Sequence, residues 1–203
     1  MKTLLRIAVL VAGLLAWQSA SAQTYCTPLF GFGGCWAGDD LQIVTMGTLV
    51  DLNTGCISSL GYDDRTYIAA PLLQVGTPQS FTLTSTSNFM FFAIYIDLNS
   101  DGDFQDANEF VWNSLAASGS VTSSFIVPTG SGTRRMRIKA VSQLVPLTQA
   151  NECTWGWQET HDYNVLLSAS GCLPPTTITS SFVSSTTATI NYVSAGTSFE
   201  VDF

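Results

Sequence analysis

Short apolar or β-branched runs, separated by Gly, Ser, Thr, Asn and Pro, follow one another along most of this chain and constrain its fold more than any other feature. Regular turn signals between short strands are typical of a β-sandwich or jelly roll. No segment keeps a 3.6-residue period long enough for a core helix, although a short helical turn is expected near Asp106–Glu109. We therefore predict an all-β fold, an antiparallel and jelly-roll-like sandwich with disulfides. The expected strands are Leu41–Val50, Thr66–Ala70, Gln79–Thr86, Phe89–Asp97, Glu109–Asn113, Ser120–Val127, Arg134–Ser142 and Asp162–Ala169.

One of these strands is apolar at almost every position. Residues 89–96 read Phe-Met-Phe-Phe-Ala-Ile-Tyr-Ile. A strand that is covered on both faces shows such a continuous run, which indicates a central place in its sheet. The chain then runs directly into Asp97, so the loop that follows has a rigid base.

The loop Asp97–Glu109 holds five of the chain's fifteen acidic residues. Oxygen-bearing side chains recur at every second position, and Gly102 stands where a chain wrapping an ion must turn sharply. This is the ligand pattern of a Ca²⁺-binding loop, although the EF-hand's closing glutamate position is taken by Asn108. The alternative is a solvated acidic turn, but five acids so close would repel one another without a cation. The predicted Ca²⁺ ligands are Asp97, Asn99, Asp101, Asp103, Asp106 and Glu109.

The N-terminus has the features of a signal peptide, with a basic start at Lys2 and Arg6, an apolar run at 7–17 and a small-x-small site at 20–22. A membrane anchor is the alternative, but the run is shorter than the roughly 20 residues that span a bilayer. We therefore predict a signal peptide at residues 1–22 and an exported chain that does not span the membrane.

Export removes Lys2 and Arg6 and lowers the formal net charge of −8 by two further units. So acidic a chain is unsuited to nucleic acid, which requires a basic footprint. Most of the remaining basic residues alternate with apolar ones in Arg134–Lys139. This pattern predicts a half-buried strand with a solvated basic face, and a phosphate or polyanion site is the alternative.

Five cysteines follow the signal peptide, and in an oxidising compartment they are expected to pair. Zinc is the rival interpretation, but the chain has no Cys-x-x-Cys and a single histidine, His161. Four cysteines allow three connectivities. Locality favours Cys26–Cys35 with Cys56–Cys153, and Cys172 is left over with a partner that could lie outside this chain.

Two tryptophans, Trp155 and Trp157, are candidate ligand-binding residues because exposed aromatic faces suit sugar rings. Packing beside Cys153 is the alternative that we favour. Catalysis finds little support, since His161 and Asp162 are neighbours on an expected strand and point to opposite faces. We do not expect this chain to be an enzyme.

Several of these landmarks together resemble the GEVED domain, a module of large secreted bacterial proteins. Its naming motif is imperfect here, because Gln158, Thr160 and His161 depart from Gly-Glu-Val-Glu-Asp-Tyr. The resemblance covers roughly residues 25–168 and implies an accessory role. It is carried by Tyr25-Cys26, Gly55-Cys56, the segment Ile94–Glu109, Val127-Pro128, Gly132–Arg137, Cys153, and Glu159, Asp162 and Tyr163.

After a GEVED-like domain at residues 23–169 and a linker at 170–175, residues 176–203 resemble the start of a fibronectin type III domain. The expected strands there are Thr176–Val183, Thr186–Val193 and Ser198–Phe203, the last of them cut short. About 28 residues are too few to close a second sandwich, which predicts that this chain is part of a longer protein.

These observations predict a secreted, calcium-stabilised, non-catalytic module of a larger extracellular or cell-surface protein, which serves adhesion, ligand binding or spacing. Its partner would be an unknown extracellular protein or a glycan. The alternative is an accessory, carbohydrate-binding domain of a secreted peptidase or glycosidase.

Overall fold

A computed structural model describes residues 24–28, 38–52, 54–55 and 60–169, together with the backbone of 177–183 and 188–193. The expected signal peptide and linker, Cys35, Cys56, Cys172 and the expected strand Ser198–Phe203 lie outside the described residues. Within them, no helix has the length and apolar character that crossing a membrane requires.

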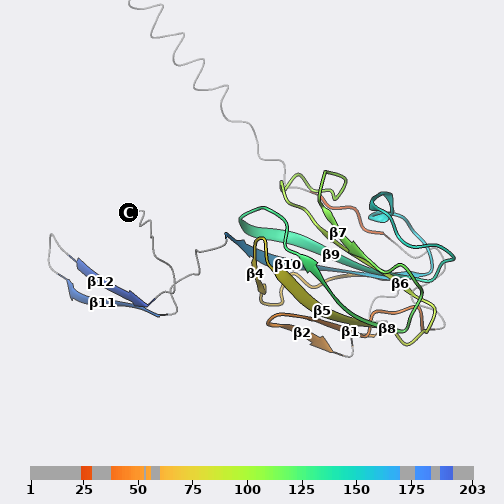
Figure 1. Cartoon of the computed structure of the whole chain (residues 1–203), viewed down its shortest axis with the longest axis horizontal. Coiled ribbons are helices and arrows are strands. Elements are labelled where there is room, and N and C mark those ends of the chain that lie inside the picture. The colour runs from red at the N-terminus through yellow and green to blue at the C-terminus, as the bar shows by residue number, and fades with distance from the viewer. Residues whose placement is uncertain are drawn as a thin grey trace, which may run out of the picture.

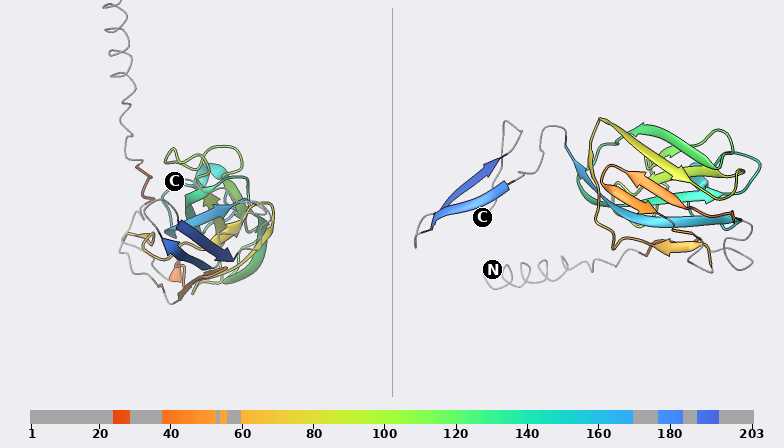
Figure 2. Two further views of the ribbon diagram at one scale, coloured as in Figure 1. Left: turned by 90° about the vertical axis from the view of Figure 1, so that its left-hand side faces the viewer. Right: turned by 90° about the horizontal axis from the view of Figure 1, so that it is seen from below.

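Two β-sheets face each other, as Figures 1 and 2 show, which confirms the all-β sandwich. The four-stranded sheet is antiparallel throughout and has the order β2-β1-β5-β8. Its strands are β1 (Ile43–Met46), β2 (Leu49–Leu52), β5 (Pro78–Thr84) and β8 (Ser120–Ile126).

The six-stranded sheet has the order β3-β10-β9-β6-β7, and β4 also pairs with β10. Contrary to the expected antiparallel sandwich, β3 and β4 run parallel to β10, because residues 60–75 follow its edge in its own direction. The strands are β3 (Tyr62–Asp64), β4 (Leu72–Gln74), β6 (Phe91–Ile96), β7 (Phe110–Asn113), β9 (Gly132–Val141) and β10 (Gln158–Ser168).

Strand β6 is buried along its whole length and lies between β9 and β7, as the apolar run predicts. Its side chains at 92, 94 and 96 enter the core between the sheets, with residues such as Leu83 and Ile138. Those at 91, 93 and 95 enter a second cluster, which includes Phe104 and Leu147 and covers the outer face of the six-stranded sheet. The core therefore has two layers, and the second is built from loops.

Two expected strands differ from the structure. Residues 41–50 do not form one strand but the β1–β2 hairpin, because Gly47 adopts a φ of 58° that permits the tight turn. Residues 66–70 form no strand, since the chain turns there through a hydrogen bond from the Ile68 N–H to the Arg65 carbonyl. A short 3₁₀ helix occurs at η2 (Gln149–Asn151) rather than after the acidic loop.

The expected solvated basic face of β9 is wrong. The side chains of Arg137 and Lys139 are 0% exposed. The alternating pattern does put them on one face, but Phe104, the segment 147–154 and residues 25–26 cover that face. These charged side chains are consequently part of the buried structure.

The expected cysteine pairing is also wrong, because Cys26 forms its disulfide with Cys153. Their Cα atoms lie 5.9 Å apart although 127 positions separate them in the sequence. Closeness in the sequence did not predict the pairing, because the N-terminal segment lies across the outer face of the sheet beside the chain that enters β10.

A two-stranded antiparallel sheet follows the sandwich, with β11 (Thr177–Val183) and β12 (Ala188–Val193) inside the expected strand ranges. Whether these strands begin a fibronectin type III domain stays a prediction.

Candidate metal-binding loop

The acidic loop begins at Asp97, directly after β6, and this residue organises the turn. Its carboxylate is buried and accepts the Ser100 N–H at 2.6 Å and the Gly102 N–H at 3.1 Å. Both of these residues have a positive φ, of 62° and 97° respectively. Glycine adopts this conformation without strain, as the sequence predicts at this sharp turn.

The rest of the turn is a series of side-chain caps at every second residue. The Asn99 Oδ1 accepts the Asp101 N–H at 3.0 Å, the Asp101 Oδ1 accepts the Asp103 N–H at 3.2 Å, and the Asp103 Oδ1 accepts the Gln105 N–H at 2.8 Å. Asp and Asn side chains form such local turns readily. The regular spacing noted in the sequence therefore fixes the backbone turn. Only one carboxylate oxygen of Asp101 and one of Asp103 cap the backbone in this way.

Three exposed carboxylates, Asp101, Asp103 and Asp106, meet at the tip of the loop, where one oxygen from each lies within 4.8 Å of the others. The Asn99 Nδ2 donates to Asp101 at 2.9 Å and to Asp106 at 2.5 Å. This triad could hold a metal ion, because carboxylate oxygens are the ligands that hard cations prefer.

The close approach of these carboxylates shifts the pKa values of two of them. The hydrogen bond from Asn99 lowers the pKa of Asp101, whereas the hydrogen bond with Asp101 raises the pKa of Asp106. Two neighbouring carboxyl groups that share one proton behave in this way. A divalent cation bound between them would remove the repulsion between the carboxylates.

The loop closes through Glu109, which is buried. Its Oε1 accepts the Leu98 N–H at 2.7 Å and its Oε2 accepts the Asp106 N–H at 3.1 Å. Burial raises the pKa of this carboxyl group. Asn108, at the EF-hand closing position, has a φ of 71° and directs the following residue inward.

The six predicted ligands therefore have different places. Asp101, Asp103 and Asp106 come together at the surface, and the Asn99 side chain contacts two of them. Asp97 and Glu109 hold the two ends of the loop by accepting backbone N–H groups. The full ligand set stays a prediction.

The base of the loop is attached to distant parts of the chain. The Tyr25 hydroxyl donates to the Asp97 Oδ2 at 2.6 Å, and burial together with this carboxylate raises the pKa of Tyr25. The Gln105 Nε2 donates to the Glu152 Oε1 at 3.0 Å, and the Gln149 Nε2 donates to the Asp106 carbonyl at 2.6 Å. The loop is thus held from both sides.

The Cys26–Cys153 disulfide joins these two sides covalently, and beneath it lies a buried ion pair. The Arg137 guanidinium binds Asp162 in a two-pronged arrangement, with distances of 2.7 Å and 2.8 Å. It also donates to the carbonyls of Cys26 at 2.7 Å and Glu152 at 3.1 Å. The fork geometry of arginine suits such an assembly of a carboxylate and carbonyls. Sequence analysis missed this network, although Arg137 and Asp162 both lie in segments that carry the family resemblance.

The motif segment 158–163 forms the first half of β10, and alternate residues serve opposite faces. Asp162 faces Arg137, whereas His161 faces the core between the sheets, with its Nδ1 3.1 Å from the Tyr163 hydroxyl. The His161 Nε2 lies 3.2 Å from the Glu159 Oε1, without hydrogen-bond geometry. The opposite orientation of His161 and Asp162 is as predicted, and it rules out their pairing as base and orienting acid.

Three further carboxylates, outside the acidic loop, are held by the structure. Asp39 and Asp40 are buried, and Asp40 accepts the Thr86 N–H at 2.7 Å. Asp63 lies 2.9 Å from the guanidinium of Arg65. These carboxylates therefore have structural partners.

The side chains of Trp155 and Trp157 are 73% and 44% exposed. Trp155 is therefore not a core residue, and whether it packs at the edge near the disulfide or binds a ligand stays a prediction. Both residues precede β10, at the end of the six-stranded sheet where β9 ends.

The architecture defines a two-sheet β-sandwich with a loop-covered outer face. Residues 91–166 match the family model of the GEVED domain, which includes β6, the acidic loop, β9 and most of β10. GEVED is a non-catalytic type of domain, and no catalytic family was detected. No curated protein matches this chain.

Among solved structures, the chain is similar to the CARDB domain of a Pyrococcus furiosus protein whose crystal structure holds di-metal ions. The two share 12% identity over 75% of this chain and 98% of that one, with a TM-score of 0.30. A likeness of this size carries no argument about function. The comparisons give no support for a fibronectin type III domain.

Proposed function

We propose that this chain is a secreted, calcium-stabilised, non-catalytic module of a larger extracellular or cell-surface protein, in which it serves adhesion, ligand binding or spacing. The observation that carries the proposal is the exposed triad of Asp101, Asp103 and Asp106, whose oxygens converge on a loop with buried ends. The Cys26–Cys153 disulfide is consistent with an oxidising, extracellular location.

Calcium fits the donor set better than a transition metal does. The converging ligands are carboxylates, and no histidine belongs to the cluster, whereas Zn²⁺ favours nitrogen and sulfur. Three exposed carboxylates also suit the weak binding of extracellular modules, with a Kd of roughly 10⁻⁴–10⁻³ M.

The test measures the melting temperature of the chain from Gln23 onward with Ca²⁺ and with chelator. Calcium at 100 times its Kd should stabilise the native state by about 2.7 kcal/mol. Asp101→Asn should abolish this shift, because it removes the charge while the amide oxygen still caps the Asp103 N–H. Asp64→Asn, which removes an exposed charge on β3, should retain it. Equal melting temperatures of the unmodified chain in Ca²⁺ and chelator would overturn the proposal.

A second candidate function is carbohydrate binding, as in an accessory domain of a secreted peptidase or glycosidase. The exposure of Trp155 and Trp157 favours it, since flat aromatic faces pack on the apolar faces of sugar rings. Glycan-array binding should then be lost in Trp155→Ala and Trp157→Ala. Binding that survives both substitutions would exclude this site.

The distribution of basic side chains also supports the proposal that nucleic acid is not a partner. Of the basic side chains in the described residues, Arg65, Arg137 and Lys139 are buried, and only Arg134 and Arg135 are partly exposed. A phosphate backbone would meet almost no positive surface here.

A further inference from the structure

The outer face of the four-stranded sheet carries no charged side chain. Its inward residues, such as Val44, Leu83 and Phe125, belong to the core, so their neighbours along each strand point outward. The twelve outward residues are Ile43, Thr45, Val50, Leu52, Pro78, Ser80, Thr82, Thr84, Ser120, Thr122, Ser124 and Ile126. Seven have hydroxyl groups and five are apolar, in a chain whose formal net charge is −8.

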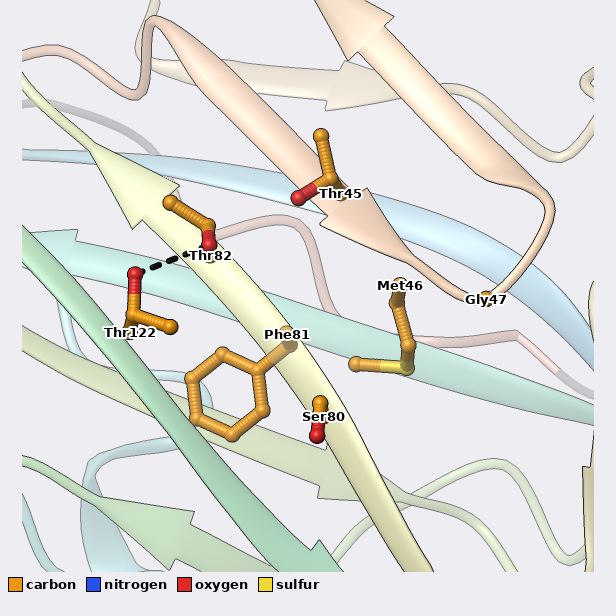
Figure 3. Close-up of a pocket in the computed structure, with 7 residues that line it drawn as sticks. All are labelled: Thr45, Met46, Gly47, Ser80, Phe81, Thr82 and Thr122. Atoms are coloured by element: carbon orange, nitrogen blue, oxygen red, sulfur yellow. Dashed lines mark hydrogen bonds between the residues drawn. The ribbon is translucent and has the colours of Figure 1, made fainter.

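Hydroxyl groups form a row across the middle of this face. Thr45 pairs with Thr82, and Thr82 pairs with Thr122, so that three threonines lie side by side on neighbouring strands (Figure 3). The hydroxyls of Thr82 and Thr122 are hydrogen-bonded at 2.9 Å. Together with Gly47 and Ser80 they line a shallow depression in the sheet surface.

Apolar side chains lie at both edges of the face. Val50 and Leu52 on β2 are 60% and 54% exposed, and Ile126 on β8 is 61% exposed. No described segment of the chain covers them. Contiguous uncharged and partly apolar surface of this kind marks an interaction site.

We propose that this face is a weak, symmetric self-association surface whose occupant is the same face of a second copy. In a twofold interface the same patch of both copies meets itself, so that a contact from residue i to residue j occurs twice. Because a hydroxyl both donates and accepts a hydrogen bond, any hydroxyl of one copy can pair with any hydroxyl of the other, whereas a patch of carboxylates would repel its copy. Apolar residues on both edges are likewise compatible with themselves.

The charge distribution supports the same occupant. Two copies of a strongly acidic chain repel each other over most of their surfaces, and an uncharged face permits the closest approach at the lowest electrostatic cost. A basic partner would instead gain more from the acidic loop than from this face. The face therefore selects for a neutral, hydroxyl-bearing partner surface, which its own copy provides.

The size of the face limits the strength of the association. Two strands of seven residues and two of four, about 4.8 Å apart and about 3.3 Å per residue, cover roughly 350 Å². Stable interfaces bury roughly 800 Å² per partner. We therefore expect a transient dimer that dissociates at roughly 10 μM to 1 mM, not an obligate one.

Sedimentation equilibrium of the chain from Gln23 onward, in chelator so that the acidic loop has no influence, tests the proposal. The expected result is a monomer–dimer equilibrium that shifts toward dimer as salt is raised, because screening weakens repulsion between the copies. An interface built on ion pairs would show the opposite salt dependence and would overturn the proposal, as would a monomer at 1 mM protein.

Variants identify the face. Thr82→Lys and, separately, Thr122→Lys should weaken dimerisation at least tenfold, because each puts two like charges into a symmetric, desolvated interface. Ser131→Lys, at an exposed loop position outside the face, changes the net charge equally and should leave it unaltered. Circular dichroism establishes that each variant is folded. Dimerisation that persists in both threonine variants, or that is lost equally in Ser131→Lys, would overturn the assignment.

Discussion

A buried lysine makes this sandwich more stable in mildly alkaline solution than at neutral pH. The Lys139 side chain is 0% exposed, and its Nζ donates to the carbonyls of Asn151 at 2.6 Å and Thr154 at 3.0 Å. Among the described residues, no carboxylate lies within ion-pair distance of it. Burial, with a further contribution from the nearby Arg137 charge, lowers the pKa of Lys139 to about 7.

The direction of the effect follows from proton counting. In the unfolded chain the lysine has its ordinary pKa of about 10.4, so between pH 7 and 10 the unfolded state binds more protons than the folded one. Stability therefore rises with pH across this window and is lowest at and below pH 7. The difference between the folded and unfolded pKa values corresponds to about 5 kcal/mol, of which about 2 kcal/mol falls between pH 7 and 9.

Urea unfolding at pH 7, 8 and 9 measures this slope. With an m-value of about 2 kcal/mol/M, the midpoint should rise by about 1 M over that range. The range ends at pH 9 because burial raises the pKa of Tyr62 and Tyr95. Their unfolded counterparts ionise near pH 10, so stability is lost again above that point.

Lys139→Met is the matched control, since it keeps the approximate length of the side chain and removes the titratable amino group. Its urea midpoint should not change between pH 7 and 9. A flat profile in the unmodified chain, or an equal slope in the methionine variant, would refute the assignment of the pH dependence to this lysine.

Three further predictions concern stability. Asp162→Asn should lower the free energy of unfolding by about 3–5 kcal/mol in urea titrations, because it leaves the buried Arg137 guanidinium without its carboxylate, whereas Asp64→Asn at the surface should cost at most about 1 kcal/mol. Replacing both cysteines of the Cys26–Cys153 disulfide by alanine should cost about 4–5 kcal/mol, measured in the same way, since the closed loop is long. Gly102→Ala should lower stability by about 1–2 kcal/mol in thermal melts, because its φ of 97° strains any residue with a Cβ.

The inter-sheet core and the position of the acidic loop were predictable because both are local patterns. The apolar run of β6 indicates burial on two faces by itself, and the Asx spacing of the loop indicates its turn by itself. The hairpin at Gly47 was missed because the strands on both sides continue the same apolar texture.

The segments that cover the outer face of the six-stranded sheet could not be predicted from local sequence patterns. The alternation in β9 correctly separates Arg137 from Met136, but a period of two says only that two faces exist. The outer face is covered by Phe104, the segment 147–154 and residues 25–26, which approach from distant parts of the sequence. The Cys26–Cys153 pairing was missed for the same reason, since it depends on this second layer.

The proposed cation ligands and the residues that hold the fold of the acidic loop are different members of one short segment. Asp97 has no exposed surface and holds two backbone N–H groups and the Tyr25 hydroxyl, whereas Asp101 is exposed at the tip. Asp97→Ala should therefore destabilise the chain in calcium and in chelator alike, by about 1.5–3 kcal/mol for lost hydrogen bonds to a charged group.

Asp101→Asn keeps the cap on the Asp103 N–H, so it should leave stability in chelator nearly unchanged and remove only the calcium-dependent part. Thermal melts of both variants in each condition give the four values that this comparison needs. If Asp97→Ala destabilised the chain only in calcium, Asp97 would be a ligand and not an anchor of the loop. Because the two aspartates belong to the same spacing pattern, only their burial distinguishes these roles, and the sequence does not contain that information.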